Sequence, residues 1–312
     1  MIITVTLNPA LDKTAELGEL KPGELNRLKN VITDVGGKGV NVSKMIAALG
    51  GRSIATGFVG GGSGEQIVKA LETMGITPDF VRANGVTRTN LKVLDSGSRL
   101  TELNEPGITV SAEEAGLLEK KLSGYANKDA IFVLAGSLCQ GVGPDFYARL
   151  ISMMHKSGAK AFLDADGASF KEALKSEEKP DFIKPNLHEL KEYFGVFKDL
   201  SLSEIRDLCF RFVDLGIPRL ILSMGKDGAM FINGKEALYA KGLKVKAHSA
   251  VGAGDSMMGA AAYALDAKLD WEKASALSLA ASAGAVATIG TKPPSRETVD
   301  ELLKEVELEA LS

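Results

Sequence analysis

The sequence predicts an α/β protein with three layers, in which helices cover both faces of a mostly parallel central sheet, and a small β-sheet lid beside them. Two observations carry this prediction. Short apolar runs alternate along the chain with longer amphipathic stretches, which is typical of strands and helices wound into a parallel sheet. Two segments, at about 13–34 and 87–104, break the alternation and predict strands outside the main sheet.

The strands of the main sheet are predicted from the short apolar runs. These runs are 2–7, 53–59, 130–134, 160–163, 182–184 and 220–223. Amphipathic helices are predicted at 64–74, 112–123, 144–156 and 202–215. In open parallel sheets ligands bind beyond the carboxyl ends of the strands, and polar clusters directly follow several of these runs, at 135–137, 184–189 and 223–225.

The segments that break the alternation are expected to form the lid. Residues 13–34 show no convincing helical period, and 89–95 and 99–104 flank Ser96-Gly-Ser as the arms of a hairpin do. We expect one domain over residues 1–312, with these strands inserted in it. Because lid strands have an exposed face and free edges, they favour pairing with another subunit, and we expect a homodimer formed through them.

Composition excludes several classes of function. Of the 312 residues, 45% are hydrophobic and 25% are charged, which argues against disorder. The 37 basic and 40 acidic side chains leave a net charge of −3, so we expect neither nucleic acid nor a membrane as the main partner. No apolar run approaches the roughly 18 residues that span a bilayer.

Cysteine and histidine show no metal-binding pattern. Cys139 and Cys209 lie far apart, and the three histidines are scattered without the spacing of a zinc site. Two reduced thiols are typical of a reducing compartment. The first apolar run, 2–7, is too short and too polar for a signal peptide, so we expect a cytoplasmic protein.

The motif Gly-Ala-Gly-Asp-Ser at 252–256 is the first candidate for catalysis. Glycine-rich backbone turns here into a predicted helix at 253–264, and free N–H groups at a helix N-terminus form an anion site. Asp255 lies in the first turn, where it can accept a proton from a hydroxyl held nearby. The alternative is an ordinary acidic residue in the first turn of a helix that follows a glycine loop.

A second glycine cluster, Gly-Gly-Lys-Gly-Val-Asn, lies at 36–41. Paired glycines let a polar ligand approach the backbone, and Asn41 offers a donor and an acceptor, as sugar hydroxyls require. Lys38 could meet an anionic group. The alternative is a turn that opens a helix at 41–49. The cluster is not a Walker A loop, because Gly-x-x-x-x-Gly-Lys-Ser/Thr occurs nowhere in the chain.

Seven motifs in order resemble those of the ribokinase-like (PfkB) carbohydrate kinase superfamily, which implies the three-layer ribokinase-like fold. They are Thr-Leu-Asn-Pro-Ala-Leu-Asp at 6–12, the cluster at 36–41, Thr-Glu-Leu-Asn-Glu-Pro-Gly at 101–107, Leu-Ala-Gly-Ser-Leu at 134–138, Lys-Pro-Asn-Leu-His-Glu at 184–189, Ser-Met-Gly-Lys-Asp-Gly at 223–228 and Val-Gly-Ala-Gly-Asp-Ser at 251–256. The motifs at 6–12 and 101–107 resemble the branch that acts on phosphorylated ketohexoses. That branch includes 1-phosphofructokinase, tagatose-6-phosphate kinase and the minor 6-phosphofructokinase.

The resemblance implies a role for each matching position. Asp255 would be the general base, and the amides of Gly252, Ala253 and Gly254 would form the anion hole. The positions that bind the acceptor sugar are Asp12, Gly36, Gly37 and Asn41. The positions that bind ATP are Lys184, Asn186, Ser223, Gly225, Gly228, Ser282 and Gly284. Glu189 would position Mg²⁺, largely through water, because this ion prefers oxygen ligands and keeps several waters.

A phosphorylated acceptor also needs cations for its own phosphate. Arg27 and Arg88 lie in the two predicted lid segments, and the guanidinium fork matches phosphate oxygens. Lids of the resembled family supply such contacts, and Lys38 is a further candidate. Ser137 could touch the sugar or its phosphate. The alternatives are two solvated surface arginines and a serine in a turn.

The resemblance thus implies transfer of a phosphoryl group from ATP to the primary hydroxyl of a ketohexose phosphate. The stretches at 87–92 and 251–257 favour fructose 1-phosphate as the acceptor. Tagatose 6-phosphate and fructose 6-phosphate remain alternatives. A neutral acceptor such as ribose would not need Arg27 and Arg88. A non-catalytic sugar-phosphate sensor is a different class, and the intact Asp255 argues against it.

Overall fold

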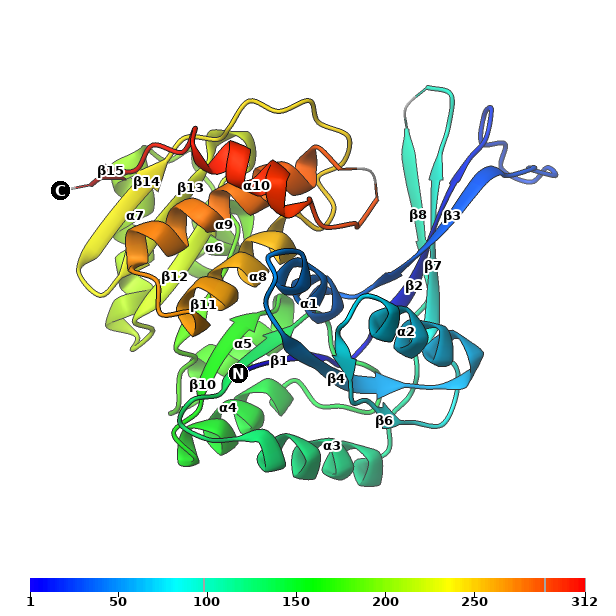
Figure 1. Cartoon of the computed structure of the whole chain (residues 1–312), viewed down its shortest axis with the longest axis horizontal. Helices are drawn as coiled ribbons and strands as arrows, with labels where there is room; N and C mark the ends of the chain where they lie inside the picture. The colour runs from blue at the N-terminus through cyan, green and yellow to red at the C-terminus, as the bar shows by residue number, and fades with distance from the viewer. Residues whose placement is uncertain (98, 289, 312) are drawn as a thin grey trace.

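A large central sheet and a small projecting sheet organise the chain (Figure 1). The computed structural model describes residues 1–97, 99–288 and 290–311. The central sheet is mostly parallel and the small sheet is separate from it, so the predicted fold class is confirmed. Within the described residues, no helix is both long enough and apolar enough to cross a membrane.

The central sheet has 11 strands. Its order is β15 (Glu309–Ala310), β14 (Glu236–Ala240), β13 (Ala229–Asn233), β12 (Arg219–Ser223), β11 (Phe182–Ile183), β10 (Lys160–Asp164), β9 (Ile131–Ala135), β1 (Ile2–Thr6), β4 (Ser53–Val59) and β5 (Thr77–Pro78), and β6 (Val81–Arg82) also pairs with β4. Pairing is parallel from β12 through to β5. The six predicted strands all lie in this parallel part, with bounds close to those predicted.

Helices cover both faces of the central sheet. They are α1 (Lys38–Ala48), α2 (Gly61–Thr73), α3 (Ala112–Tyr125), α4 (Phe146–Lys156), α5 (Gly167–Lys175), α6 (Leu187–Phe194), α7 (Leu202–Asp214), α8 (Ala253–Asp266), α9 (Trp271–Val286) and α10 (Arg296–Leu303). Successive strand residues point to opposite faces. Ile3 and Phe132 therefore join the core under α3 to α7, whereas Ile2 and Ile131 join the core under α1, α8, α9 and α10. Two cores on opposite faces give the predicted three layers.

The small sheet has four strands in the order β3 (Lys29–Gly36), β2 (Ala10–Glu16), β7 (Arg88–Leu94) and β8 (Leu100–Asn104). The hairpins β2–β3 and β7–β8 are antiparallel, and β2 and β7 join them in parallel. These strands lie mostly in the two segments that broke the alternation, although β2 begins earlier, at Ala10, and β3 ends later, at Gly36. The predicted hairpin turn includes Ser98, which lies outside the described residues.

The antiparallel edge of the central sheet was not predicted. Strands β13, β14 and β15 follow β12 as successive antiparallel neighbours. The turn between β13 and β14 contains Gly234, with a φ of +59°, which suits a hairpin. The two residues of β15 are too few for a period to show in the sequence. This edge lies on the far side of the sheet from the lid (Figure 1).

Candidate active site

A cavity of about 650 Å³ opens beyond the carboxyl ends of β10, β11 and β12, where ligands bind in sheets of this kind. Its volume lies within the roughly 300–1,000 Å³ of ordinary ligand pockets. The predicted site residues that line it are Lys38, Lys184, Asn186, Glu189, Ser223, Gly225, Gly228, Ala253, Gly254, Asp255 and Ser282. These residues come from four of the seven motifs, together with Ser282, so the cavity brings together motifs that are distant in the chain.

The first turn of α8 forms one end of this cavity. Gly252 is the N-cap and has a φ of +81°, a conformation that glycine adopts without strain. The first helical hydrogen bond is donated by Ser256 to the Gly252 carbonyl, so the amides of Gly254 and Asp255 precede the helical ladder. The Ala253 amide donates to the Ala250 carbonyl at 3.4 Å. An anion at this end of the cavity would meet the positive end of the helix.

Asp255 is buried at this helix end and is held by Asn41. The Asn41 Nδ2 atom donates to Asp255 Oδ2 at 2.8 Å. Burial raises the pKa of Asp255, and the nearby Asp164 carboxylate raises it further, against the opposing effects of Asn41, Lys38 and Lys184. A carboxylate with a raised pKa is a stronger base than a solvated one, which suits a group that takes a proton from a hydroxyl.

Asp164, which the sequence analysis did not select, lies between two lysines at the end of β10. Lys38 Nζ is 3.2 Å from Asp164 Oδ1, and Lys184 Nζ is 3.3 Å from Oδ2. Burial acts to raise the pKa of Asp164, but the two ammonium groups lower it overall. The Asp164 carboxylate in turn raises the pKa of Lys38. Lys38 and Lys184 thus flank Asp164 beside the cavity, next to the N-terminus of α8.

Asn186 and Glu189 form the capping box that begins α6. Asn186 Oδ1 accepts from the Glu189 amide at 2.9 Å, and Glu189 Oε2 accepts from the Asn186 amide at 2.8 Å. One carboxylate oxygen of Glu189 is thus used, and Oε1 has no hydrogen bond within the described residues. No group of three or more His, Cys, Asp or Glu side chains in the described chain could hold a metal ion. The site fits Mg²⁺ held chiefly by phosphate and water oxygens, with Glu189 beside it.

The nucleotide-side positions do not all face the cavity. The end of β12 and the turn after it supply Ser223, Gly225 and Gly228. Asn186, which follows β11, forms an isolated parallel β-bridge with Ser223. Ser282 on α9 lines the cavity, but Gly284 does not. A Cβ atom on Gly284 would lie 2.8 Å from Pro294 Cβ, so this glycine lets α9 approach the segment before α10.

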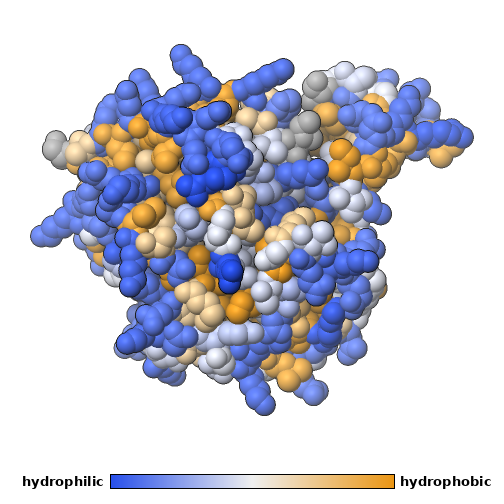
Figure 2. All heavy atoms as spheres, in the orientation of Figure 1, coloured by the Kyte–Doolittle hydropathy of each residue, from blue (hydrophilic) through white to orange (hydrophobic). Residues whose placement is uncertain are grey.

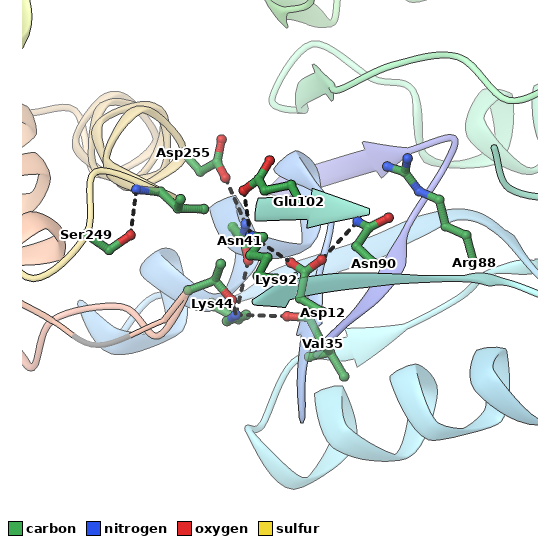
Figure 3. A network of polar contacts seen from close by, with 12 residues as sticks. Asp12, Val35, Asn41, Lys44, Arg88, Asn90, Lys92, Glu102, Ser249 and Asp255 are labelled. Atoms are coloured by element: carbon green, nitrogen blue, oxygen red, sulfur yellow. Dashed lines mark hydrogen bonds and ion pairs between the residues drawn. The ribbon is translucent and has the colours of Figure 1, made fainter. Parts of the chain in front are cut away.

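The acceptor-side positions gather where the lid meets the central sheet (Figure 3). Asp12 on β2 accepts from Asn90 Nδ2 at 2.9 Å and lies 3.9 Å from Lys92 Nζ. Gly36 packs against the Asp12 carboxylate, and a Cβ atom on Gly37 would lie 2.8 Å from Thr6 Cγ2. Both glycines thus let the end of β3 approach β2 and the end of β1.

Asn90 and Lys92 were missed by the sequence analysis, although the two-residue period of a strand could have found them. They share a face of β7 with Arg88, since alternate residues of a strand point the same way. Lys92 also lies 4.0 Å from Glu102 on β8. Asn90 Oδ1 and Arg88 Nε are buried without a hydrogen-bond partner among the described residues. Such atoms are rare and fit a polar ligand that completes them.

The predicted phosphate-binding residues lie in different places. Arg88 is half-buried, and its Nη2 donates to the Asn8 carbonyl at 3.0 Å. Arg27 is exposed in the segment between β2 and β3. That segment lies at the end of the lid farthest from the central sheet (Figure 1). Ser137 is exposed directly after β9. The structure therefore brings Arg88 near Asp12 and Asn90 but leaves Arg27 in solvent.

Several known proteins are similar to this chain over most of its length. It is 31% identical to a 1-phosphofructokinase of Vibrio cholerae, over 99% of this chain and 97% of the relative. It is 36% identical to a 1-phosphofructokinase of Borreliella burgdorferi, over 85% of each. Phosphofructokinase-2 from Escherichia coli, solved in complex with fructose-6-phosphate, superposes with a TM-score of 0.90 at 28% identity, over 97% of this chain and 98% of that one.

The fold extends to a more distant structure. Ribokinase from Thermotoga maritima superposes with a TM-score of 0.77 at 23% identity, over 97% of this chain and 99% of that chain, which confirms the predicted ribokinase-like fold. The family described as pfkB family carbohydrate kinase matches residues 5–298. The chain therefore belongs to the pfkB family of carbohydrate kinases, as its motifs predicted.

Proposed function

We propose that this protein transfers a phosphoryl group from ATP to the free primary hydroxyl of fructose 1-phosphate, giving fructose 1,6-bisphosphate. Two relatives at 31% and 36% identity are named 1-phosphofructokinase, which supports a fructose-phosphate acceptor. The observation that carries the proposal is the position of Asp255. Its buried carboxylate lies at the helix N-terminus, between the cavity and the acceptor-side cluster around Asn41.

Asp255 is proposed as the general base. The acceptor hydroxyl gives its proton to the carboxylate as its oxygen attacks the γ-phosphorus, and the bond to ADP breaks. The negative charge that spreads over the phosphoryl oxygens is met by the amides of Gly252, Ala253 and Gly254. Burial supports this role, because it raises the pKa of Asp255 and so strengthens the base.

The cavity is proposed as the ATP site. Lys38 and Lys184 provide two charged ammonium groups for the phosphates, and Asp164 holds both in place. Apolar side chains of Leu243 and Leu279 line another part of the wall, as an adenine ring requires. Ser223, Gly225, Gly228 and Ser282 complete the proposed nucleotide contacts, with Asn186 and Lys184 at the phosphate end.

Mg²⁺ is proposed as the ion that accompanies ATP. When bound, it neutralises part of the phosphate charge. Glu189 is proposed to orient the waters of this ion through its free Oε1 atom, while Oε2 remains in the capping box. Because the protein offers so few oxygen ligands here, we propose that the ion enters together with the nucleotide.

The acceptor is proposed to lie against Asp12, Gly36, Gly37 and Asn41, with its phosphate near Arg88. The buried Arg88 Nε and Asn90 Oδ1 atoms have no hydrogen-bond partner among the described residues, which supports a polar ligand beside them. Lys38, Ser137 and Arg27 are further proposed contacts. Fructose 6-phosphate is the second candidate acceptor, because the similar Escherichia coli structure holds that sugar phosphate. Tagatose 6-phosphate remains a third.

A panel of acceptors tests the proposed substrate. Release of ADP would be measured with Mg-ATP and fructose 1-phosphate, fructose 6-phosphate, tagatose 6-phosphate, fructose and ribose. We expect kcat/KM for fructose 1-phosphate to exceed the others by about tenfold or more, because a pocket built for one arrangement of polar groups rejects others. Preference for another ketohexose phosphate would change the acceptor alone. Activity on neutral sugars only would contradict the proposed phosphate site.

Removing the proposed phosphate contacts should weaken acceptor binding selectively. We expect Arg88→Ala to raise the KM for the sugar phosphate by about tenfold or more, since a charged hydrogen bond is worth roughly 1.5–3 kcal/mol. The KM for ATP should change little. Arg27→Ala, alone and with Arg88→Ala, tests the exposed arginine. Arg82→Ala, an exposed arginine paired with Glu65, is the matched control. An unchanged acceptor KM in the double variant would argue for a neutral acceptor.

A homodimer through the lid is also proposed. Large apolar side chains on and beside the lid are exposed: Leu25, Leu28, Val31, Ile32, Leu94, Leu100 and Leu103. Figure 2 shows apolar surface gathered on the projecting part of the molecule. Leu25 is 75% exposed and Leu103 is 58% exposed, which favours burial against a second copy rather than solvent.

Light scattering at micromolar concentration tests the dimer. We expect the mass of two chains for the wild type and of one chain for Leu103→Asp, because a carboxylate placed in an apolar interface must lose its water. Leu117→Asp on α3 is the matched control, since Leu117 is 50% exposed outside the lid. A wild-type protein with the mass of one chain would refute the proposal.

A further inference from the structure

Lys44 is a buried lysine that the proposed mechanism leaves without a role. It lies on α1, one turn after Asn41, and is only 4% exposed. Its Nζ atom donates to the Val35 carbonyl at 2.9 Å, to Asn41 Oδ1 at 3.0 Å and to Thr291 Oγ1 at 3.4 Å. The ammonium group therefore uses all three of its donors inside the protein (Figure 3).

These three bonds join separate parts of the site. Val35 belongs to the end of β3, where the lid strand meets the central body. Asn41 carries the hydrogen bond to Asp255. Thr291 lies in the segment between α9 and α10, and is also buried. A single ammonium group thus links the root of the lid, the proposed acceptor site and the C-terminal part of the chain.

Lys44 determines which way the Asn41 carboxamide faces. An ammonium group has donors only, so the atom of Asn41 that meets it must be the acceptor oxygen, Oδ1. The amide nitrogen, Nδ2, is then turned toward Asp255, to which it donates. With the carboxamide reversed, Nδ2 would meet the ammonium donors and Oδ1 would meet a carboxylate oxygen. Both contacts would then be repulsive.

Burial disfavours the charged form of Lys44. Burial lowers its pKa to about 8, while the facing carboxylates of Asp34, Asp12 and Asp255 act to raise it and Lys292 acts to lower it. An apolar side chain of similar size would fill this place without the loss of hydration that a buried charge suffers. The geometry and the cost together indicate that the cation serves the site rather than the stability of α1.

We propose that Lys44 is a positioning residue for phosphoryl transfer, which fixes the Asn41 carboxamide so that it donates to Asp255. This inference rests on the proposed role of Asp255 as the base. Lys44 itself is not placed in contact with the substrate or with ATP. It acts on the base through Asn41, and on the lid through the Val35 carbonyl.

A double-mutant cycle tests whether Lys44 acts through Asn41. We expect Lys44→Met to lower kcat by about tenfold or more in the wild type and by less than about threefold in an Asn41→Ala background, because residues that share one contact are not additive. The KM for ATP should stay within about twofold. An equal fold-loss in both backgrounds, or an unchanged kcat in Lys44→Met, would overturn the proposal.

Two further variants separate positioning from folding. Lys44→Arg keeps the cation and its donors, and should retain most of the kcat that Lys44→Met loses. Lys179→Met is the matched control, since Lys179 Nζ donates to the Leu174 and Ser176 carbonyls in a half-buried place outside the site. It should leave kcat unchanged. Loss of kcat in both lysine-to-methionine variants would show a general effect of removing buried lysines and would count against positioning.

Titration of Asp255 tests Lys44 without any turnover. The carboxyl carbons of aspartate would be followed by NMR against pH, with Asp255→Asn used to assign the signal. We expect Lys44→Met to raise the pKa of Asp255, because a nearby cation and an ordered hydrogen bond are both lost. An unchanged pKa of Asp255 in Lys44→Met would contradict the inference. If the wild type phosphorylates no sugar phosphate, the proposed function fails and this titration still decides the role of Lys44.

Discussion

The burial of the Asp255 carboxylate against Asn41 is the constraint on which the rest of the site depends. The two side chains come from α8 and α1, which are more than 200 residues apart in the chain but share one face of the central sheet. Close packing of these helices makes the contact possible. A Cβ atom on Gly259 would lie 2.8 Å from Met45 Cβ and 2.9 Å from the Val42 carbonyl, so a larger residue would push α8 away from α1. The small residues of α8 therefore serve the geometry of the site.

Two neighbouring carboxylates have their pKa values moved in opposite directions by their surroundings. Asp164 lies between Lys38 and Lys184, which lower its pKa despite burial, whereas burial raises the pKa of Asp255. Divergent pKa values at one site are typical of groups with separate tasks. Asp164 stays charged and holds two lysines beside the cavity, while Asp255 is the better proton acceptor. Lys44 is a third group whose pKa its surroundings shift, since burial lowers it. It lies on the proposed acceptor side, beside Asn41.

Much of the architecture could be predicted from the sequence, since buried parallel strands are apolar runs and the lid breaks their alternation. The side-chain partners that come from distant segments of the chain could not be predicted in this way. Asp164 directly follows the predicted strand at 160–163 and belongs to none of the seven motifs, and no motif marks Lys44 either. Their partners, such as Lys38 for Asp164 and Thr291 for Lys44, are distant in the chain. Asn186 was assigned to ATP and Glu189 to the metal, yet the two residues also begin α6 as a capping box, which their spacing alone could have shown. Gly284 was assigned to the nucleotide, but it packs against Pro294.

The central claim is that Asp255 removes the proton from the acceptor hydroxyl. The most direct test compares kcat of the wild type and of Asp255→Asn on the preferred acceptor, with ATP affinity of both measured by calorimetry. Asparagine keeps the shape of the side chain and cannot accept the proton. The account predicts that kcat falls by about 10²–10⁴-fold or more while ATP still binds. A loss below about tenfold, with ATP binding intact, would mean that another group is the base.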